Sequence, residues 1–80
     1  MKIIESKYKL GQRVGVINLD MPSQILPAWV IGTDIEKKNG RWQAEYTIAE
    51  LYDEIRDKFG LIADGVPEED LRDESEINSL

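Results

Sequence analysis

The sequence predicts a small, mainly β domain, and three observations lead to that fold class. An Asn-Gly pair lies between two apolar segments, β-branched residues alternate near the N-terminus, and Gly, Pro and Asp separate short apolar runs. With 80 residues the chain forms one domain. A domain of this size buries only about 60–65% of the surface that its unfolded chain exposes, so its core is small.

The first expected strand covers residues 12–19. Val14 and Val16 fall on one face of it, which is typical of a half-buried strand. Residues 20–27 read DMPSQILP, and the two prolines in this stretch argue against a continuous strand or helix. We therefore expect a loop over 20–27 that carries apolar side chains.

The clearest local signal is a β-hairpin centred on Asn39-Gly40. This pair favours a two-residue type I′ turn, because both turn positions need a positive φ. The resulting register places Ile35 opposite Ala44 and Ile31 opposite Ile48. It gathers most of the large apolar side chains on one face, and a slip by one residue would reverse that face for one strand. The expected apolar face comprises Trp29, Ile31, Thr33, Ile35, Trp42, Ala44, Tyr46 and Ile48.

The pattern changes in residues 49–60, AELYDEIRDKFG. Leu51, Ile55 and Phe59 recur at the spacing of one helical face, and Gly60 suits the position after a helix. We expect one short amphipathic helix here, packed on the sheet by its apolar stripe.

The closing segment reads GVPEEDLRD over residues 65–73. Val66 is biased to extended geometry because a proline follows it. Pro67 suits the start of a single helical turn. The acidic residues that follow it interact favourably with the positive N-terminal end of that turn. Leu71 then points back to the core. The run is therefore interpreted as a strand end and one capped turn; an acidic contact surface is the alternative.

The order of these elements resembles small SH3-like barrels. YKLGQRVGV (8–16) is similar to their aromatic-x-x-Gly-x-x-Val-x-Val opening, and VPEEDLR (66–72) is similar to their closing turn and strand. The resemblance is to SH3-like proteins of bacteria, phages and mobile elements, many of them of unassigned function. It implies one barrel domain over 1–73, followed by a flexible acidic tail over 74–80. The helix before the last strand departs from the plain pattern.

Composition removes several classes of chemistry. The chain has no cysteine and no histidine, which excludes thiol catalysis, disulfides and the usual general base at neutral pH. Its carboxylates do not have calcium-loop spacing, and its glycines do not form a phosphate-binding loop. We therefore expect a protein that is not an enzyme and uses no metal or cofactor. No apolar run approaches the length of a membrane span, so a cytoplasmic protein without membrane contact is expected.

Charge is divided unevenly along the chain. The net charge is −6, but residues 1–41 carry seven basic side chains against four acidic ones, whereas residues 42–80 carry three against twelve. Overall acidity argues against nonspecific binding to a phosphate backbone.

The leading functional hypothesis is a non-enzymatic protein-interaction module, an accessory protein of a phage or mobile element by its resemblance. The alternatives are a nucleic-acid-directed protein and an acidic DNA mimic that inhibits a host defence protein. A homo-oligomer is left open. The candidate contact residues lie in the 20–27 segment, directly after it, and in the basic hairpin tip; they are Met21, Ile25, Leu26, Trp29, Lys37, Lys38 and Arg41.

Overall fold

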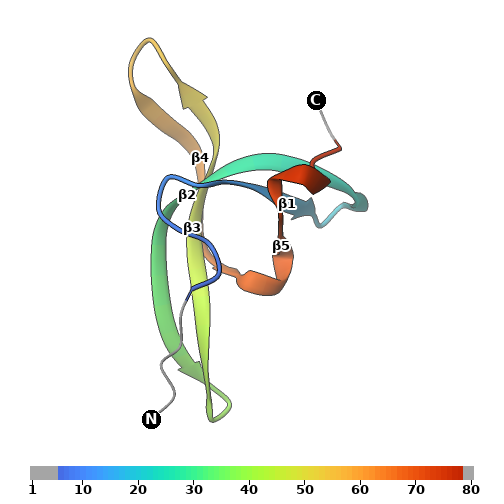
Figure 1. The fold of residues 1–80 in the computed structure, drawn as a ribbon, viewed down its shortest axis with the longest axis vertical. Helices are drawn as coiled ribbons and strands as arrows, with labels where there is room; N and C mark the ends of the chain where they lie inside the picture. The colour runs from blue at the N-terminus through green and yellow to red at the C-terminus, as the bar shows by residue number, and fades with distance from the viewer. Residues whose placement is uncertain (1–5, 79–80) are drawn as a thin grey trace.

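Five antiparallel strands form one open sheet, in the order β4-β3-β2-β1-β5, in a computed structural model that describes residues 6–78 (Figure 1). The mainly β class is confirmed. The strands are β1 (Arg13–Asn18), β2 (Met21–Lys38), β3 (Arg41–Asp53), β4 (Lys58–Pro67) and β5 (Leu71–Arg72). Two single-turn 3-10 helices, η1 (Glu68–Asp70) and η2 (Glu74–Glu76), flank β5.

The hairpin between β2 and β3 has the predicted turn. Asn39 has a φ of 51° and Gly40 a φ of 78°, as a type I′ turn requires at its two central positions. Strand pairing runs from the turn in the predicted register, and Ile35 faces Ala44. The local turn chemistry therefore fixes this half of the hairpin.

Farther from the turn, a β-bulge shifts the register of β2 against β3. Gly32 pairs with Thr47, but Val30 rather than Ile31 pairs with Ile48. The extra residue reverses the faces of the remaining β2 residues. Val30 is accordingly fully buried, and the predicted pairing of Ile31 with Ile48 is wrong.

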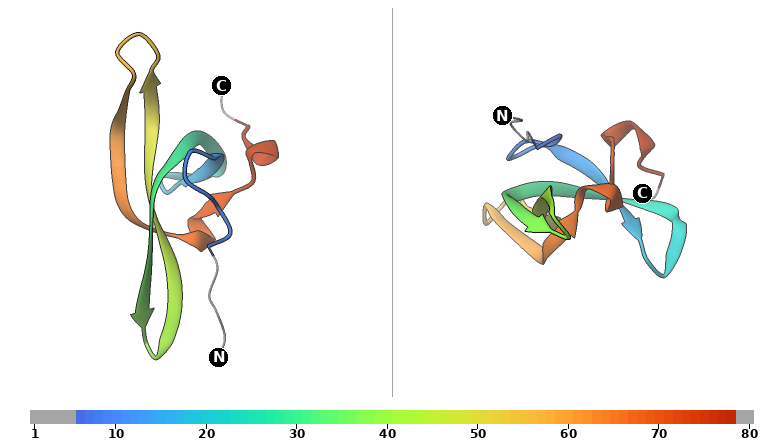
Figure 2. Two further views of the ribbon diagram at one scale, coloured as in Figure 1. Left: turned by 60° about the vertical axis from the view of Figure 1, so that its left-hand side comes forward. Right: turned by 90° about the horizontal axis from the view of Figure 1, so that it is seen from below.

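A second bulge lies in β4, on the other side of β3, opposite Thr47. Tyr46 pairs with Val66 and Ile48 with Ala63, so two β4 residues, Asp64 and Gly65, stand opposite Thr47. The Thr47 hydroxyl donates to Asp64 Oδ1 at 2.7 Å, the Gly65 N–H donates to the same oxygen at 2.9 Å, and Gly65 has a φ of 64°. Bulges increase local twist and bending. The sheet as a whole is strongly coiled, as the two views in Figure 2 show.

The short helix predicted over 49–60 is wrong. β3 continues to Asp53 and β4 begins at Lys58, so this stretch forms a second hairpin. Its turn is held by Asp53, whose Oδ1 accepts the N–H groups of Ile55 and Arg56 at 3.0 and 3.2 Å. A short polar side chain that binds the following backbone offers an alternative to the helix. The apolar stripe that suggested a helix lies largely exposed along the hairpin.

The loop predicted over 20–27 is also wrong, because β2 already begins at Met21. Leu26 and Pro27 pair with Val16 and Gly15 of β1. Pairing with β3 starts only at Trp29, so this part of β2 has a neighbour on one side. Proline is tolerated in such edge positions because no partner there needs its missing N–H.

The core lies on the concave side of the bent sheet. Val14 and Val16 are buried, as predicted for the first strand. Tyr46 is buried with an edge-on contact to Tyr8, with ring centroids 5.6 Å apart. The buried cluster comprises Tyr8, Val14, Val16, Ala28, Val30, Ala44, Tyr46, Ile48 and Leu71.

The Tyr46 hydroxyl connects three segments of the chain. It accepts the Tyr8 N–H at 3.2 Å and donates to Glu68 Oε1 at 2.6 Å. Glu68 Oε1 also accepts the Lys7 N–H at 3.0 Å. Burial, and then the hydrogen bond to Glu68, raises the pKa of Tyr46. The hydroxyl therefore stays protonated and holds the N-terminal segment and η1 to β3.

The closing segment follows its prediction. β4 ends at Pro67, η1 forms one turn, and Leu71 is 2% exposed in the core. The described part of the predicted tail, residues 74–78, forms η2 and reaches β2. Asn78 exchanges backbone and side-chain hydrogen bonds with Ile25. The flexible tail stays a prediction, and these contacts weigh against it.

Replacing Gly40 with Val tests the turn. Open space surrounds the position, so any loss reports backbone conformation alone. We expect the free energy of unfolding to fall by about 1 kcal/mol or more, because a β-branched residue resists positive φ. Urea denaturation measures it. Gly60→Ala is the control, since a Cβ there meets its nearest neighbour at an ordinary 3.7 Å. Equal stability of the two variants would contradict the type I′ turn.

Replacing Tyr46 with Phe tests the hydroxyl bridge. The ring stays buried, but the Tyr8 N–H loses its acceptor, so we expect a loss of about 1–3 kcal/mol. Tyr52→Phe is the matched control, because Tyr52 is 37% exposed and donates only to exposed Asp57. Thermal melts of both variants give the comparison. A Tyr46→Phe protein as stable as Tyr52→Phe would show that the bridge contributes nothing.

Candidate protein-binding surfaces

An apolar groove of about 380 Å³ opens where β1 and β4 face each other across the bend of the sheet. Its volume falls in the range of sites that take a small ligand or a few side chains. Leu26 and Val66, both packed against the core, form part of its wall. The lining residues are Val16, Ile17, Asn18, Leu19, Leu26, Ile48, Glu50, Ala63, Gly65, Val66, Pro67 and Asp70.

The polarity of this apolar groove is uneven. Its charged lining residues, Glu50 of β3 and Asp70 of η1, are both acidic. Leu19, in the turn between β1 and β2, is 77% exposed and lies at the margin. The site therefore offers apolar walls to a hydrophobic side chain and two carboxylates to flanking cationic groups.

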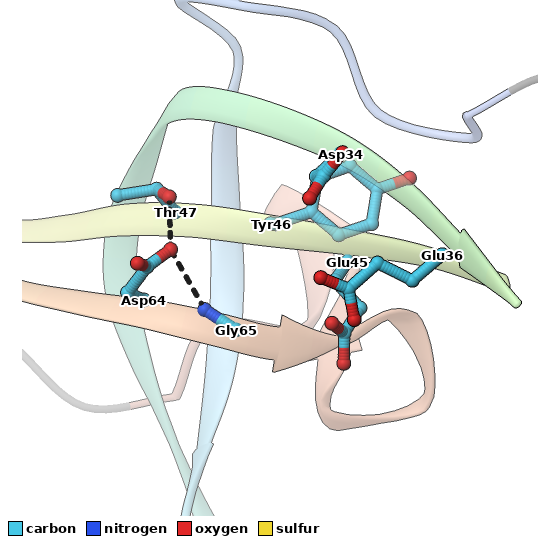
Figure 3. Close-up of a pocket in the computed structure, with 7 residues that line it drawn as sticks. All are labelled: Asp34, Glu36, Glu45, Tyr46, Thr47, Asp64 and Gly65. Atoms are coloured by element: carbon cyan, nitrogen blue, oxygen red, sulfur yellow. Dashed lines mark hydrogen bonds between the residues drawn. The ribbon is translucent and has the colours of Figure 1, made fainter. Parts of the chain in front are cut away.

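A second, acidic pocket of about 250 Å³ lies beside the paired bulges (Figure 3). Asp34, Glu36, Glu45 and Asp64 contribute four carboxyl groups to it. Asp64 is already bound to Thr47 and Gly65, as the dashed lines in Figure 3 show. Among residues 6–78, no group of acidic side chains is arranged to hold a metal ion.

Glu45 is the one buried charged residue among those described, with 7% exposure. Lys38 donates to its Oε2, and this hydrogen bond lowers the pKa of Glu45 and raises that of Lys38. The neighbouring Glu45 carboxylate raises the pKa of Glu36, through the hydrogen bond that a protonated Glu36 can donate to it and through its like charge. The three groups form an acid pair with one cation, which is sufficient to explain them as a structural cluster.

A third surface is the outer part of the second hairpin, residues 49–63, which we call the β3–β4 arm. It projects from the body of the protein at the upper left of Figure 1. Ile55 is 97% exposed, and Leu61 is 63% exposed with a φ of 51°. A bulky residue at positive φ costs roughly 1–3 kcal/mol. Several large apolar side chains of the arm are exposed: Leu51, Tyr52, Ile55, Phe59, Leu61 and Ile62.

Aromatic side chains link the β3–β4 arm to the body. The ring of Tyr52 lies 4.9 Å from that of Phe59 and 6.3 Å from that of Trp29, measured between centroids. The Arg13 guanidinium stands 5.9 Å from the Trp29 ring centroid. These contacts run from Trp29, which pairs with Ala49 at the base of the arm, to the Tyr52–Phe59 pair near its turn, and they leave the aliphatic side chains of the arm exposed.

The structure does not bring the seven sequence-predicted contact residues into one site. Leu26 lines the apolar groove, Met21 is 56% exposed, and Ile25 is half-buried next to Asn78. Trp29 lies at the base of the β3–β4 arm. Their role in binding stays a prediction.

The basic members of that set lie at the opposite hairpin tip. Lys37 stands 5.9 Å from the Trp42 ring centroid, and Lys38 is paired with Glu45. Trp42 pairs with Lys37 in the predicted register but is 56% exposed, so it lies outside the core. Arg41 is exposed beside the turn.

Sequence reasoning missed most of the groove and all of the arm. The groove residues come from four strands, and no spacing in the chain relates Ile17 to Ala63. The arm did carry a signal, because Leu51, Ile55 and Phe59 are apolar and periodic in the sequence. Their spacing also fits one face of a helix, which is why the sequence predicts a helix there.

Replacing Glu36 with Gln tests the acid pair. The pKa of Glu36 is raised from its ordinary value of 4.5. Glu36 therefore stabilises the fold at pH values below 4.5, and this contribution is lost as the pH rises through the pKa of Glu36 in the folded protein. At pH 7 the substitution removes a like charge and keeps a hydrogen-bonding side chain. We therefore expect a higher melting temperature at pH 7 and no gain below about pH 4.

Glu54→Gln is the control, because Glu54 is an exposed residue of the β3–β4 turn. Melting curves between about pH 3 and 8 give the comparison. A Glu36→Gln protein that melts lower than the parent at pH 7 would contradict the arrangement.

The described residues include no helix of the length and apolarity needed to cross a membrane. No protein-family model, curated protein or solved structure matches the chain.

Proposed function

We propose that this protein is a non-enzymatic protein-interaction module built on an SH3-like barrel. The strong bend of the sheet, the strand order and the single turn before the last strand support that fold. Fold alone does not determine function, so the proposal rests on the surface.

The apolar groove is the observation that carries the proposal. Its walls are hydrophobic, and its two charged groups, Glu50 and Asp70, are both acidic. A protein segment fits this chemistry when it carries an apolar anchor with Lys or Arg beside it. Burial of the anchor would supply affinity, and the carboxylates would supply orientation and selectivity.

The contacts of the basic hairpin tip make a nucleic-acid-directed function the weaker hypothesis. Lys38 is engaged by Glu45 and Lys37 stands beside Trp42. The net charge of −6 would also repel a phosphate backbone.

Selection of a random peptide library on the immobilised protein tests the proposal, because the library presents every combination of anchor and flanking charge. We expect the selected peptides to share an apolar anchor flanked by basic residues. Titration of labelled peptides by fluorescence anisotropy then gives dissociation constants. Leu19→Asp should weaken binding by about tenfold or more, because it places a charge at the margin of the groove.

Leu10→Asp is the matched control. Leu10 is 65% exposed but does not line the groove, so this variant should bind as the parent does. Equal loss in both variants, or a selection that yields no binders, would overturn the proposal. A labelled oligonucleotide at about 0.15 M salt tests the other class, because steeply salt-dependent binding that is lost on replacing Lys37 and Arg41 would favour it instead.

A further inference from the structure

We propose that two copies of this chain associate through their β3–β4 arms, with the two β4 strands side by side and antiparallel about a two-fold axis at Leu61. The proposal concerns a surface separate from the apolar groove. It follows from the exposed side chains of the arm, the free edge of β4 and the placement of charges along that edge.

The first observation is an apolar surface without a partner in the monomer. Leu51, Ile55 and Leu61 are 56%, 97% and 63% exposed. Ile62 on the same strand as Leu61 is 59% exposed. Exposed apolar groups that gather on one element mark an interaction site. The positive φ of Leu61 adds to this, since an exposed leucine gains no packing within the monomer to offset its backbone strain.

The second observation is the position of β4 in the sheet. It is an end strand, paired with β3 on one side only, and ten residues long. An edge of this length is a template for pairing with another chain. The positive φ of Leu61 interrupts regular strand geometry at its middle, so side-chain packing rather than a continuous ladder must supply much of the contact.

The third observation is the charge pattern along this edge. Lys58 lies three residues before Leu61 and Asp64 three residues after it. A two-fold axis at Leu61 therefore brings Lys58 of each copy to Asp64 of the other. Lys58 makes no ion pair among the described residues, and both hydrogen bonds of Asp64 use Oδ1. The two charges are thus available to each other across the axis.

The pairing also brings the arm turn of each copy toward the acidic pocket of the other. The turn carries Arg56, which pairs with Asp53 at 3.8 Å, and also two further acids, Glu54 and Asp57. Apart from Lys58, the turn therefore adds no net attraction to the acidic pocket. The placement of Lys58 and Asp64 at equal distances from Leu61 makes the edge self-complementary at these two positions, as a two-fold interface requires. The net charge of −6 on each chain opposes association, so a weak, concentration-dependent dimer is expected.

Charge reversal tests the register. Sedimentation equilibrium between roughly 5 and 500 µM should show the parent shifting from monomer to dimer. Lys58→Glu alone, or Asp64→Lys alone, should weaken dimerisation by about tenfold or more, because each places like charges opposite each other. An equimolar mixture of the two variants should recover the dimer, because the carboxylate introduced in one chain then meets the ammonium group introduced in the other.

Leu61→Asp tests the same axis without changing the Asp64 bulge. It should abolish dimerisation while circular dichroism shows the parent fold, since the side chain is exposed. Leu19→Asp, in the groove, should dimerise as the parent does, which separates this proposal from the proposed function. A parent that stays monomeric at the highest concentration, or a dimer that neither reversal weakens and the mixture does not restore, would overturn the inference.

Discussion

The row of the sheet at Thr47 is the constraint on which the rest of the structure depends. β2 and β4 each carry an extra residue opposite this point, one on either side of β3. Two bulges in one row bend the sheet where a single one would only kink one strand. The bend turns the two halves of β2 in different directions, so one half pairs with β1 and the other with β3. Without it, the sheet would have no concave side and no core.

Gly32 shows why this row tolerates little change. A Cβ at this position would lie 3.1 Å from the Thr47 Cβ, which is closer than nine in ten such contacts in proteins. Thr47 in turn binds Asp64, which receives the Gly65 N–H. Three strands are thus fixed at one level by a close approach, a hydroxyl and a carboxylate. The apolar groove and the acidic pocket both include Gly65 among their lining residues, so both are shaped by this row.

Local turn chemistry was readable in the sequence, whereas the effects of distant residues were not. Asn39-Gly40 predicts its turn because two adjacent residues determine it, and the burial of Leu71 follows from the turn after Pro67. The bulge at Ile31 depends on what lies opposite, which no single strand reveals. Residues 49–60 have an apolar period that suits a helix, but Asp53 binds the backbone of a turn instead. Of the predicted contact residues only Leu26 lines the groove, because the other walls come from strands brought together by the bend.

The two edges of the sheet differ greatly in length, and this limits how the protein can assemble. β5 has two residues and is followed closely by η2, whereas β4 has ten. Fibrillar aggregation needs two free edges, so that each added chain exposes a new one. A pair of molecules joined through β4 leaves the two-residue β5 edges and the unpaired side of β2 over residues 21–28, where Pro22 and Pro27 have no N–H to offer a third chain. The short last strand and the prolines of β2 therefore protect a small β protein from open-ended polymerisation, even at concentrations where its long edge is occupied.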